Sequence, residues 1–245
     1  SAGGGIFPRT QKSITLSDAA ASAIGLKKTT ATPTEIMNAI LRARVDLLWF
    51  GGIGTYVRAT TESNQDVGDR ANDAIRVAAA EIGATVIGEG ANLGVTQRGR
   101  IEFGLLGGRC NSDAIDNSAG VNSSDVEVNI KIALAAAMRR KKLTRAARNT
   151  LLADMTEDVA ALVLANNYEQ TLALSMAERR GLSYLPHQRR FISGLEARGL
   201  LDRKVELLPD EMAFAEREAK GQPLTRAELG VLLAYAKLTL FDDLV

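Results

Sequence analysis

The stretch ATVIGEGANLG, residues 84–94, joins a short apolar run to a turn with three glycines in seven residues. The apolar run predicts a buried β-strand, and the glycines predict a tight turn where that strand ends. The spacing is close to G-x-G-x-x-G, which cradles a dinucleotide pyrophosphate when it opens the first crossover of a sheet. Here a strand and two helices are expected before it, and the helix after it is short. The pattern therefore favours a plain turn over a pyrophosphate loop.

The segments around this stretch alternate between helix and strand. TPTE, residues 32–35, is a capping box that predicts a helix to about residue 44, and VDLLWF, residues 45–50, predicts a strand buried on both faces. Residues 64–83 place their apolar side chains on one helical face, which predicts a helix. A short helix at 96–106 and a weak strand before Asp116 follow. The alternation predicts an open, parallel α/β sheet over residues 1–120.

Residues 121–245 have a different composition, because glycine is sparse and Ala, Leu, Arg and Glu dominate. This composition predicts an all-helical region. The expected helices cover residues 121–141, 144–180, 185–198, 208–220 and 224–244. We therefore expect two domains, an α/β unit at 1–120 and a helical unit at 121–245.

The overall composition narrows the classes of function. A formal net charge of +1 over 245 residues gives no support for nucleic acid or an anionic membrane as a partner, and the longest apolar runs are well short of the roughly 20 residues of a membrane span. The single cysteine, Cys110, cannot form an intramolecular disulfide and suits a cytoplasmic location. With one histidine, His187, no Cys/His metal site is expected. The start, SAGGGIFPRTQKS, indicates part of a longer polypeptide.

Candidate ligand-binding residues follow the expected strands, since ligands of open parallel sheets bind outside the carboxyl ends of the strands. Residues 51–55 and 90–92 occupy such positions, and Asn92 adds an amide that both donates and accepts hydrogen bonds. DNSAGVNSSDVE, residues 116–127, opens the long helix, whose free N–H groups at 121–124 would suit a carboxylate or phosphate. Alternatively, Asn122 or Ser123 only caps that helix.

Other reactive side chains have simpler interpretations. His187 is interpreted as a surface histidine and Cys110 as a buried thiol. RRKK, residues 139–142, would place cations at the carboxyl end of the long helix, where they favour the helix dipole. Asp69 and Asp73 would be exposed charges on a helix and not an acid–base pair.

Three of these segments together resemble the large bacterial NAD-dependent glutamate dehydrogenases. The family pattern E-G-A-N matches residues 89–92, and N-A-G-G-V-x-x-S matches residues 117–124, with Ser118 and Ala119 in place of the usual Ala and Gly. The third segment is VDLLWFGGIGTYV, residues 45–57. The resemblance covers roughly residues 1–131, and the helical remainder fits the extension of the large class.

The resemblance implies roles for particular residues. Ser124 would bind the side-chain carboxylate of glutamate. Residues 51–55 read GGIGT where smaller relatives have CATQN. This difference leaves the implied backbone contacts with the nicotinamide ribose but changes the side-chain contacts. The family's glycine fingerprint and its catalytic Lys and Asp would lie upstream, so we expect no catalytic residue in this chain. The implied NAD-binding residues are Gly51, Gly52, Ile53, Gly90, Asn92 and Asn117.

The implied activity is oxidative deamination of L-glutamate to 2-oxoglutarate and ammonia, with hydride transfer to NAD. It would need the rest of the same polypeptide, in an intact enzyme that forms a homo-oligomer, and this chain alone would be inactive. Two alternatives remain at this point. One is another amino-acid dehydrogenase of the same superfamily, although Ser124 argues against an apolar substrate side chain. The other is a non-catalytic helical interaction module.

Overall fold

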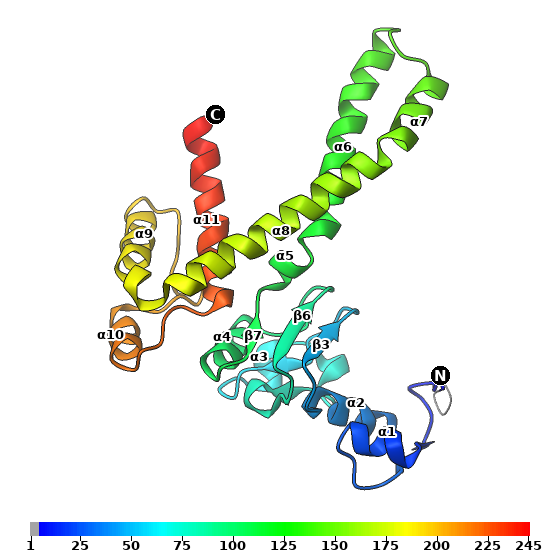
Figure 1. The fold of residues 1–245 in the computed structure, drawn as a ribbon, viewed down its shortest axis with the longest axis vertical. Helices are drawn as coiled ribbons and strands as arrows, with labels where there is room; N and C mark the ends of the chain where they lie inside the picture. The colour runs from blue at the N-terminus through cyan, green and yellow to red at the C-terminus, as the bar shows by residue number, and fades with distance from the viewer. Residues whose placement is uncertain (1–4) are drawn as a thin grey trace.

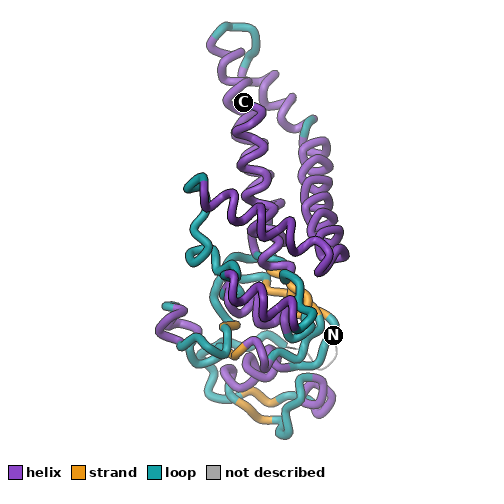
Figure 2. Tube along the Cα trace, turned by 90° about the vertical axis from the view of Figure 1, so that its left-hand side faces the viewer, coloured by secondary structure: helices purple, strands orange, loops and turns teal. Residues whose placement is uncertain are grey.

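A computed structural model describes residues 5–245, so the first four residues of the segment that carries the family resemblance lie outside it. The α/β region occupies the lower part of Figure 1 and the helical region the upper part, and Figure 2 shows strands only in the former. Its elements are β1 (Ile14–Thr15), α1 (Asp18–Ala23), β2 (Thr30–Ala31), α2 (Pro33–Arg42), β3 (Leu47–Phe50), β4 (Val57–Arg58), α3 (Asn64–Val67), β5 (Val77–Ala78), β6 (Val86–Glu89), α4 (Gln97–Leu105), β7 (Arg109–Cys110) and α5 (Asp113–Asp116).

The central sheet is parallel, with strand order β3-β6-β7. Phe50 pairs with Glu89, and Ile87 pairs with Cys110, so the carboxyl ends of β3 and β6 lie side by side. Helix α4 forms the crossover from β6 to β7. Two shorter pairs accompany this sheet, β1-β2 antiparallel and β4-β5 parallel. The predicted fold class, a partial Rossmann-type open parallel sheet followed by helices, is confirmed.

Strand β3 differs from its prediction, because only one of its faces is buried. Phe50 lies in the core, whereas Leu47 is 54% and Trp49 59% exposed. The Trp49 indole lies over β6, where a Cβ atom added to Gly88 or Gly90 would come within 2.5 or 2.2 Å of its ring atoms. Two glycines of the GEGANLG turn therefore make room for the indole.

The prediction of a single helix over residues 64–83 was wrong. Helix α3 ends at Val67 because Gly68 adopts the left-handed conformation with φ of 74°, and the chain continues through a 3-10 turn (Arg70–Asn72) into β5. The apolar spacing that suggested one helical face instead serves a strand and a second 3-10 turn (Ala79–Glu81). Arg76 stabilises this arrangement. Its buried guanidinium donates to the Thr55 carbonyl at 2.9 Å and so ties the segment to the loop after β3.

The interpretation of Asp69 and Asp73 as exposed charges on a helix was also wrong, because both lie in this non-helical segment and contact Arg76. Each forms an ion pair with Arg76, at 3.9 Å for Asp69 and 2.5 Å for Asp73. Asp69 also accepts the N–H of Thr55 at 2.8 Å and the amide of Asn72 at 2.7 Å. These hydrogen bonds hold the pKa of Asp69 below its usual value. The two carboxylates therefore stabilise a loop.

The helical region matches its prediction closely. Its core combines side chains of α8, α9, α10 and α11, with Phe214 and Ile192 fully buried. The expected helix at 144–180 is interrupted at Met155, which separates α7 from α8. Helices α6 and α7 form an arm that projects away from the sheet (Figure 1). The elements are α6 (Ser118–Arg139), α7 (Arg145–Asp154), α8 (Thr156–Arg180), a 3-10 turn (Gly181–Tyr184), α9 (Leu185–Ala197), α10 (Glu211–Ala219) and α11 (Arg226–Leu244).

The capping box at residues 32–35 is confirmed, since the Thr32 hydroxyl accepts the Glu35 N–H and the Glu35 carboxylate accepts the Thr32 N–H. The division into domains at residue 120 stays a prediction. Over residues 5–245, no helix combines the length and the apolar character that crossing a bilayer requires.

Candidate functional site

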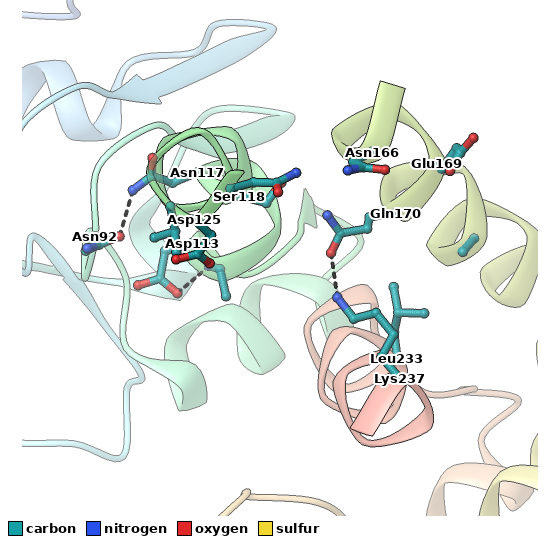
Figure 3. A pocket seen from close by; sticks show the side chains of 14 residues that line it. Asn92, Asp113, Asn117, Ser118, Asp125, Asn166, Glu169, Gln170, Leu233 and Lys237 are labelled. Atoms are coloured by element: carbon teal, nitrogen blue, oxygen red, sulfur yellow. Dashed lines mark hydrogen bonds between the residues drawn. The ribbon is translucent and has the colours of Figure 1, made fainter. Parts of the chain in front are cut away.

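A cavity of about 630 Å³ lies where the α/β region meets the helical region. Its walls come from the loop after β6, from α5 and the start of α6, and from α8 and α11 (Figure 3). The α/β side contributes Asn92, Asp113 and Asn117, and the helical side contributes Gln170 and Lys237. The cavity therefore lies at the carboxyl end of β6, where an open parallel sheet binds its ligands.

The structure brings Asn92 and Asn117 into direct contact. The Nδ2 atom of Asn117 donates a hydrogen bond to Oδ1 of Asn92 at 2.8 Å, although 25 residues separate them in the chain (Figure 3). Asn92 follows β6, and Asn117 lies between α5 and α6. Both amides line the cavity. Two amide groups held together in this way offer donors and acceptors to one ligand.

Gly51, Gly52 and Ile53 follow β3, at the neighbouring strand end. The Ala91 N–H donates to the Phe50 carbonyl at 3.0 Å, so the turns after β3 and β6 begin side by side. Ile53 is 76% exposed, and a Cβ atom at Gly52 would meet open space. Within the described part of the chain, residues 51–53 are not among those that line the cavity. Gly90 lies beneath Trp49 instead.

The start of the long helix differs from the prediction, which placed it at residue 121. Helix α6 begins at Ser118, because the Asn117 N–H bonds to the Asp113 carbonyl at 2.8 Å and α5 leads almost directly into α6. The free N–H groups therefore belong to the turn before residue 121. Asn122 and Ser123 do not cap this helix. The Ser123 hydroxyl instead bonds to the Ala119 carbonyl at 2.7 Å.

Ser124 lies in the second turn of α6, and its side chain is exposed. Its neighbour Asp125 lines the cavity. Because the helix begins six residues earlier, free backbone N–H groups do not accompany its hydroxyl.

A buried ion pair supports the turn after β6. The Glu89 carboxylate, whose side chain is 1% exposed, accepts bonds from Arg100 at 2.6 and 2.9 Å and from the Val95 N–H at 3.0 Å. Burial raises the pKa of Glu89, and the bonds from Arg100 oppose that shift. We had not predicted this pair. The signal for it was a lone acidic residue at the end of an apolar strand, followed 11 residues later by an arginine on the crossover helix.

The helical region holds the segment that carries Asn117. The Asn167 amide on α8 donates to the Ile115 carbonyl at 2.9 Å and to the Ser118 hydroxyl at 2.8 Å. Arg226, at the start of α11, donates to the Asn111 side chain at 2.8 Å. These contacts make α8 and α11 a wall of the cavity and fix its position relative to α5.

The other candidate residues lie outside this cavity. His187 is exposed and stacks on Tyr184 with ring centroids 4.9 Å apart. Cys110 is buried on β7, and desolvation raises the pKa of its thiol to about 12. Residues 139–142 end α6 and begin the turn after it, and they are exposed. No group of three or more His, Cys, Asp or Glu side chains within residues 5–245 has the arrangement of a metal site.

The chain is an α/β protein with an open parallel sheet, and its cavity with the paired amides lies at the carboxyl edge of that sheet, the position where such sheets generally bind ligands. A family model described as "Bacterial NAD-glutamate dehydrogenase, catalytic domain" matches residues 1–177. The chain belongs to this family. Helices α9, α10 and α11 lie beyond the matched residues.

Three curated relatives match the whole chain, and each is an NAD-specific glutamate dehydrogenase. The chain is 51% identical over 245 residues to the protein of Pseudomonas aeruginosa and 49% identical over 245 residues to that of Halomonas elongata, and it covers 15% of each. It is 45% identical over 251 residues to the protein of Mycobacterium tuberculosis and covers 16% of it. The chain thus spans about one sixth of the length of these relatives. The family resemblance inferred from the motifs is confirmed.

Proposed function

We propose that this chain forms the nicotinamide side of the NAD site in an enzyme that oxidises L-glutamate to 2-oxoglutarate and ammonia. The observation that carries the proposal is the Asn92–Asn117 pair, which lines the cavity at the carboxyl end of β6. The similarity to NAD-specific glutamate dehydrogenases supports it. When bound, NAD supplies the hydride acceptor, and the chain orients it.

The residues present fit the nicotinamide end of NAD. That end carries ribose hydroxyls and a carboxamide, which both donate and accept hydrogen bonds, as the Asn92 and Asn117 amides do. The cavity volume of about 630 Å³ falls within the usual range for small-molecule sites, roughly 300–1,000 Å³. The glycine backbone of the neighbouring turn, at residues 51 and 52, would let the cofactor approach closely, and Gly90 would do so once the Trp49 indole that covers it moved aside. Ile53 would contribute its backbone.

Ser124 is proposed to bind the side-chain carboxylate of glutamate through its hydroxyl. A hydrogen bond to a charged group contributes about 1.5–3 kcal/mol, and no free N–H groups accompany it here, so the lower end applies. Ser124→Ala should therefore reduce kcat/KM for glutamate about tenfold, with little change in NAD affinity. The melting temperature should not change, because Ser124 is exposed and does not cap α6. An unchanged kcat/KM would remove Ser124 from the site.

The catalytic Lys and Asp are proposed to come from another part of the same polypeptide, so this chain alone should form no NADH from glutamate. Loss of one acid–base group costs on the order of 10²–10⁴ in rate, and here both would be missing. The intact enzyme is proposed to act in the cytoplasm as a homo-oligomer. Glutamate-dependent NADH formation by the purified 245-residue chain would contradict this assignment.

The experiment that tests the proposed function uses the full-length polypeptide with Asn117→Ala. The dissociation constant for NAD should rise about tenfold, since one good hydrogen-bonding group is lost. Asn129→Ala is the matched control, because Asn129 is an exposed asparagine on α6, the helix that follows Asn117, and it should leave NAD binding within about twofold. Unchanged NAD affinity in Asn117→Ala would contradict the proposal. Oxidation of leucine or valine at the rate of glutamate would instead favour another amino-acid dehydrogenase.

A further inference from the structure

The turn that carries Asn92 is held at three points by carboxylates. Asp116 accepts the N–H of Glu89 at 2.9 Å, Asp113 accepts the N–H of Leu93 at 2.9 Å, and Glu89 accepts the N–H of Val95 at 3.0 Å. Asn92 lies between the first two of these bonds. Its position therefore depends on side chains that do not themselves need to touch a ligand.

Leu93 shows why the middle bond matters. Its φ of 66° is in the left-handed region, which is unfavourable for a bulky residue with a Cβ atom. Its side chain is 58% exposed, so packing provides little restraint on this conformation. The hydrogen bond from its N–H to Asp113 is a specific contact that holds the turn there. Unusual backbone conformations of this kind concentrate at ligand sites, where the surroundings impose them.

Asp113 is itself fixed from two sides. Its carboxylate lies 3.2 Å from the guanidinium of Arg100, which forms the buried pair with Glu89. It also begins α5, and its carbonyl accepts the N–H of Asn117 at 2.8 Å. One short helical turn thus carries both the anchor of the Asn92 turn and the partner of the Asn92 side chain. Figure 3 shows Asp113, Asn92 and Asn117 on the same side of the cavity.

We propose that Asp113 is a positioning residue for the NAD site, which holds the turn so that the Asn92 amide stays against Asn117. This rests on the proposed function, because it assigns Asp113 an effect on NAD that passes through Asn92. Asp113 also lines the cavity, and the proposal assigns its effect on affinity to the hydrogen bond from Leu93 and not to a contact with the cofactor. The left-handed conformation of Leu93 would be the state that the carboxylate selects.

A double-mutant cycle in the full-length polypeptide tests the proposal, with NAD binding measured by calorimetry. Asp113→Ala and Asn92→Ala should each raise the dissociation constant for NAD about tenfold. The double variant should bind no more weakly than Asn92→Ala alone, since residues that act through one another are not additive. Asp113→Asn keeps an oxygen that can accept the Leu93 N–H, so it should recover part of the affinity lost in Asp113→Ala.

The control is Asp66→Ala, because Asp66 accepts the Ser63 N–H at 2.8 Å in a turn that is not part of the cavity. It should leave NAD binding within about twofold. Multiplied effects in the double variant, about a hundredfold, would overturn the positioning role and leave the proposed function intact. The positioning role is also overturned, with the proposed function intact, if Asn92→Ala weakens NAD binding and Asp113→Ala does not. If Asn92→Ala has no effect on NAD, the proposed function itself fails at this residue. Should Asp113→Ala not fold, Asp113→Leu takes its place in the cycle, because it keeps a side chain of similar shape and offers no acceptor to the Leu93 N–H.

Discussion

Each of the two regions of the molecule has its own apolar core, and the regions differ in the length of their elements and in how their turns are fixed. In the α/β region, the strands are two to four residues long, and buried charged groups such as Arg76, Glu89 and Arg100 bond to the backbone or carboxylates of neighbouring turns. In the helical region, long helices pack around an apolar core that includes Phe214 and Ile192. The comparison shows that the candidate ligand site depends on polar contacts between loops, and that the helices provide a packed wall.

The largest expected effect comes from opening the apolar core of the helical region. Phe214 is fully buried, so Phe214→Ala should cost about 3–5 kcal/mol of unfolding free energy. If the regions are held independently, hydrogen exchange should rise in α9, α10 and α11 and stay low in β6 and β7. Phe214→Leu keeps most of the volume and should cost less. Equal loss of protection from hydrogen exchange in both regions would show that the two regions are not stabilised independently.

The next largest effect should come from the polar contacts of the α/β region. Arg76→Leu leaves the Thr55 carbonyl and the carboxylates of Asp69 and Asp73 without their buried partner. Breaking a buried ion pair costs about 3–5 kcal/mol, and the lower end applies because the carboxylates are 26% and 38% exposed. Urea unfolding should show this loss, with faster exchange confined to residues 51–73. Arg76→Lys keeps the positive charge but lacks the planar guanidinium, so it should recover only part of the unfolding free energy that Arg76→Leu loses. A loss below about 1 kcal/mol would show that these contacts do not hold the turn.

A smaller effect concerns the indole that lies over β6. In Gly88→Ala, the new Cβ atom would come within 2.5 Å of the Trp49 ring, so the exposed indole should swing toward water. Because Ala also suits a strand better than Gly, by roughly 0.5–1 kcal/mol, stability should change by about 1 kcal/mol or less. Trp49 is the single tryptophan, and its fluorescence should shift to longer wavelength. Gly194→Ala, on α9 with open space around it, should leave the emission unchanged. An unshifted emission in Gly88→Ala would mean that the indole does not rest on β6 in solution.

Cys110 offers a reporter of the α/β region alone. Its thiol is buried, and a pKa of about 12 leaves almost no thiolate at pH 8, so disulfide exchange reagents should label it at least ~100-fold more slowly than in urea. Phe214→Ala should leave this rate nearly unchanged, whereas Arg76→Leu should raise it. Rapid labelling of the native protein at pH 8 would contradict the burial of β7.

The sequence predicted the helical region well because its helices are long and begin with strong signals. Thr144, Asp210 and Thr225 each accept the N–H of the residue three positions later and so begin α7, α10 and α11. The parallel sheet was also predictable from the alternation of β-like runs with helices. The exposure of one face of β3 could not be predicted, because the continuous apolar run VDLLWF does not reveal that only one face of this strand is covered.

The segment 64–83 could not be predicted from its local pattern. Apolar residues spaced three or four apart are compatible with a helix, but the buried guanidinium of Arg76 and the left-handed Gly68 select turns and a strand. Gly68 was a local signal for the end of a helix, whereas the role of Arg76 depends on its contact with Thr55, which is distant in the chain. The same is true of the site. The motifs placed Asn92 and Asn117 at strand and helix ends, but the carboxylates of Asp113 and Asp116 that bond to the turn around Asn92 have no local signature.

The most direct test of the central claim is a structure of the full-length polypeptide with NAD bound. We expect the nicotinamide ribose or carboxamide to lie within hydrogen-bonding distance, about 2.7–3.2 Å, of the Asn92 or Asn117 side chain. The nicotinamide end should enter the cavity between α5, α6 and α8. A nicotinamide bound elsewhere, with the Asn92–Asn117 pair facing only solvent, would show that this pair is not part of the NAD site.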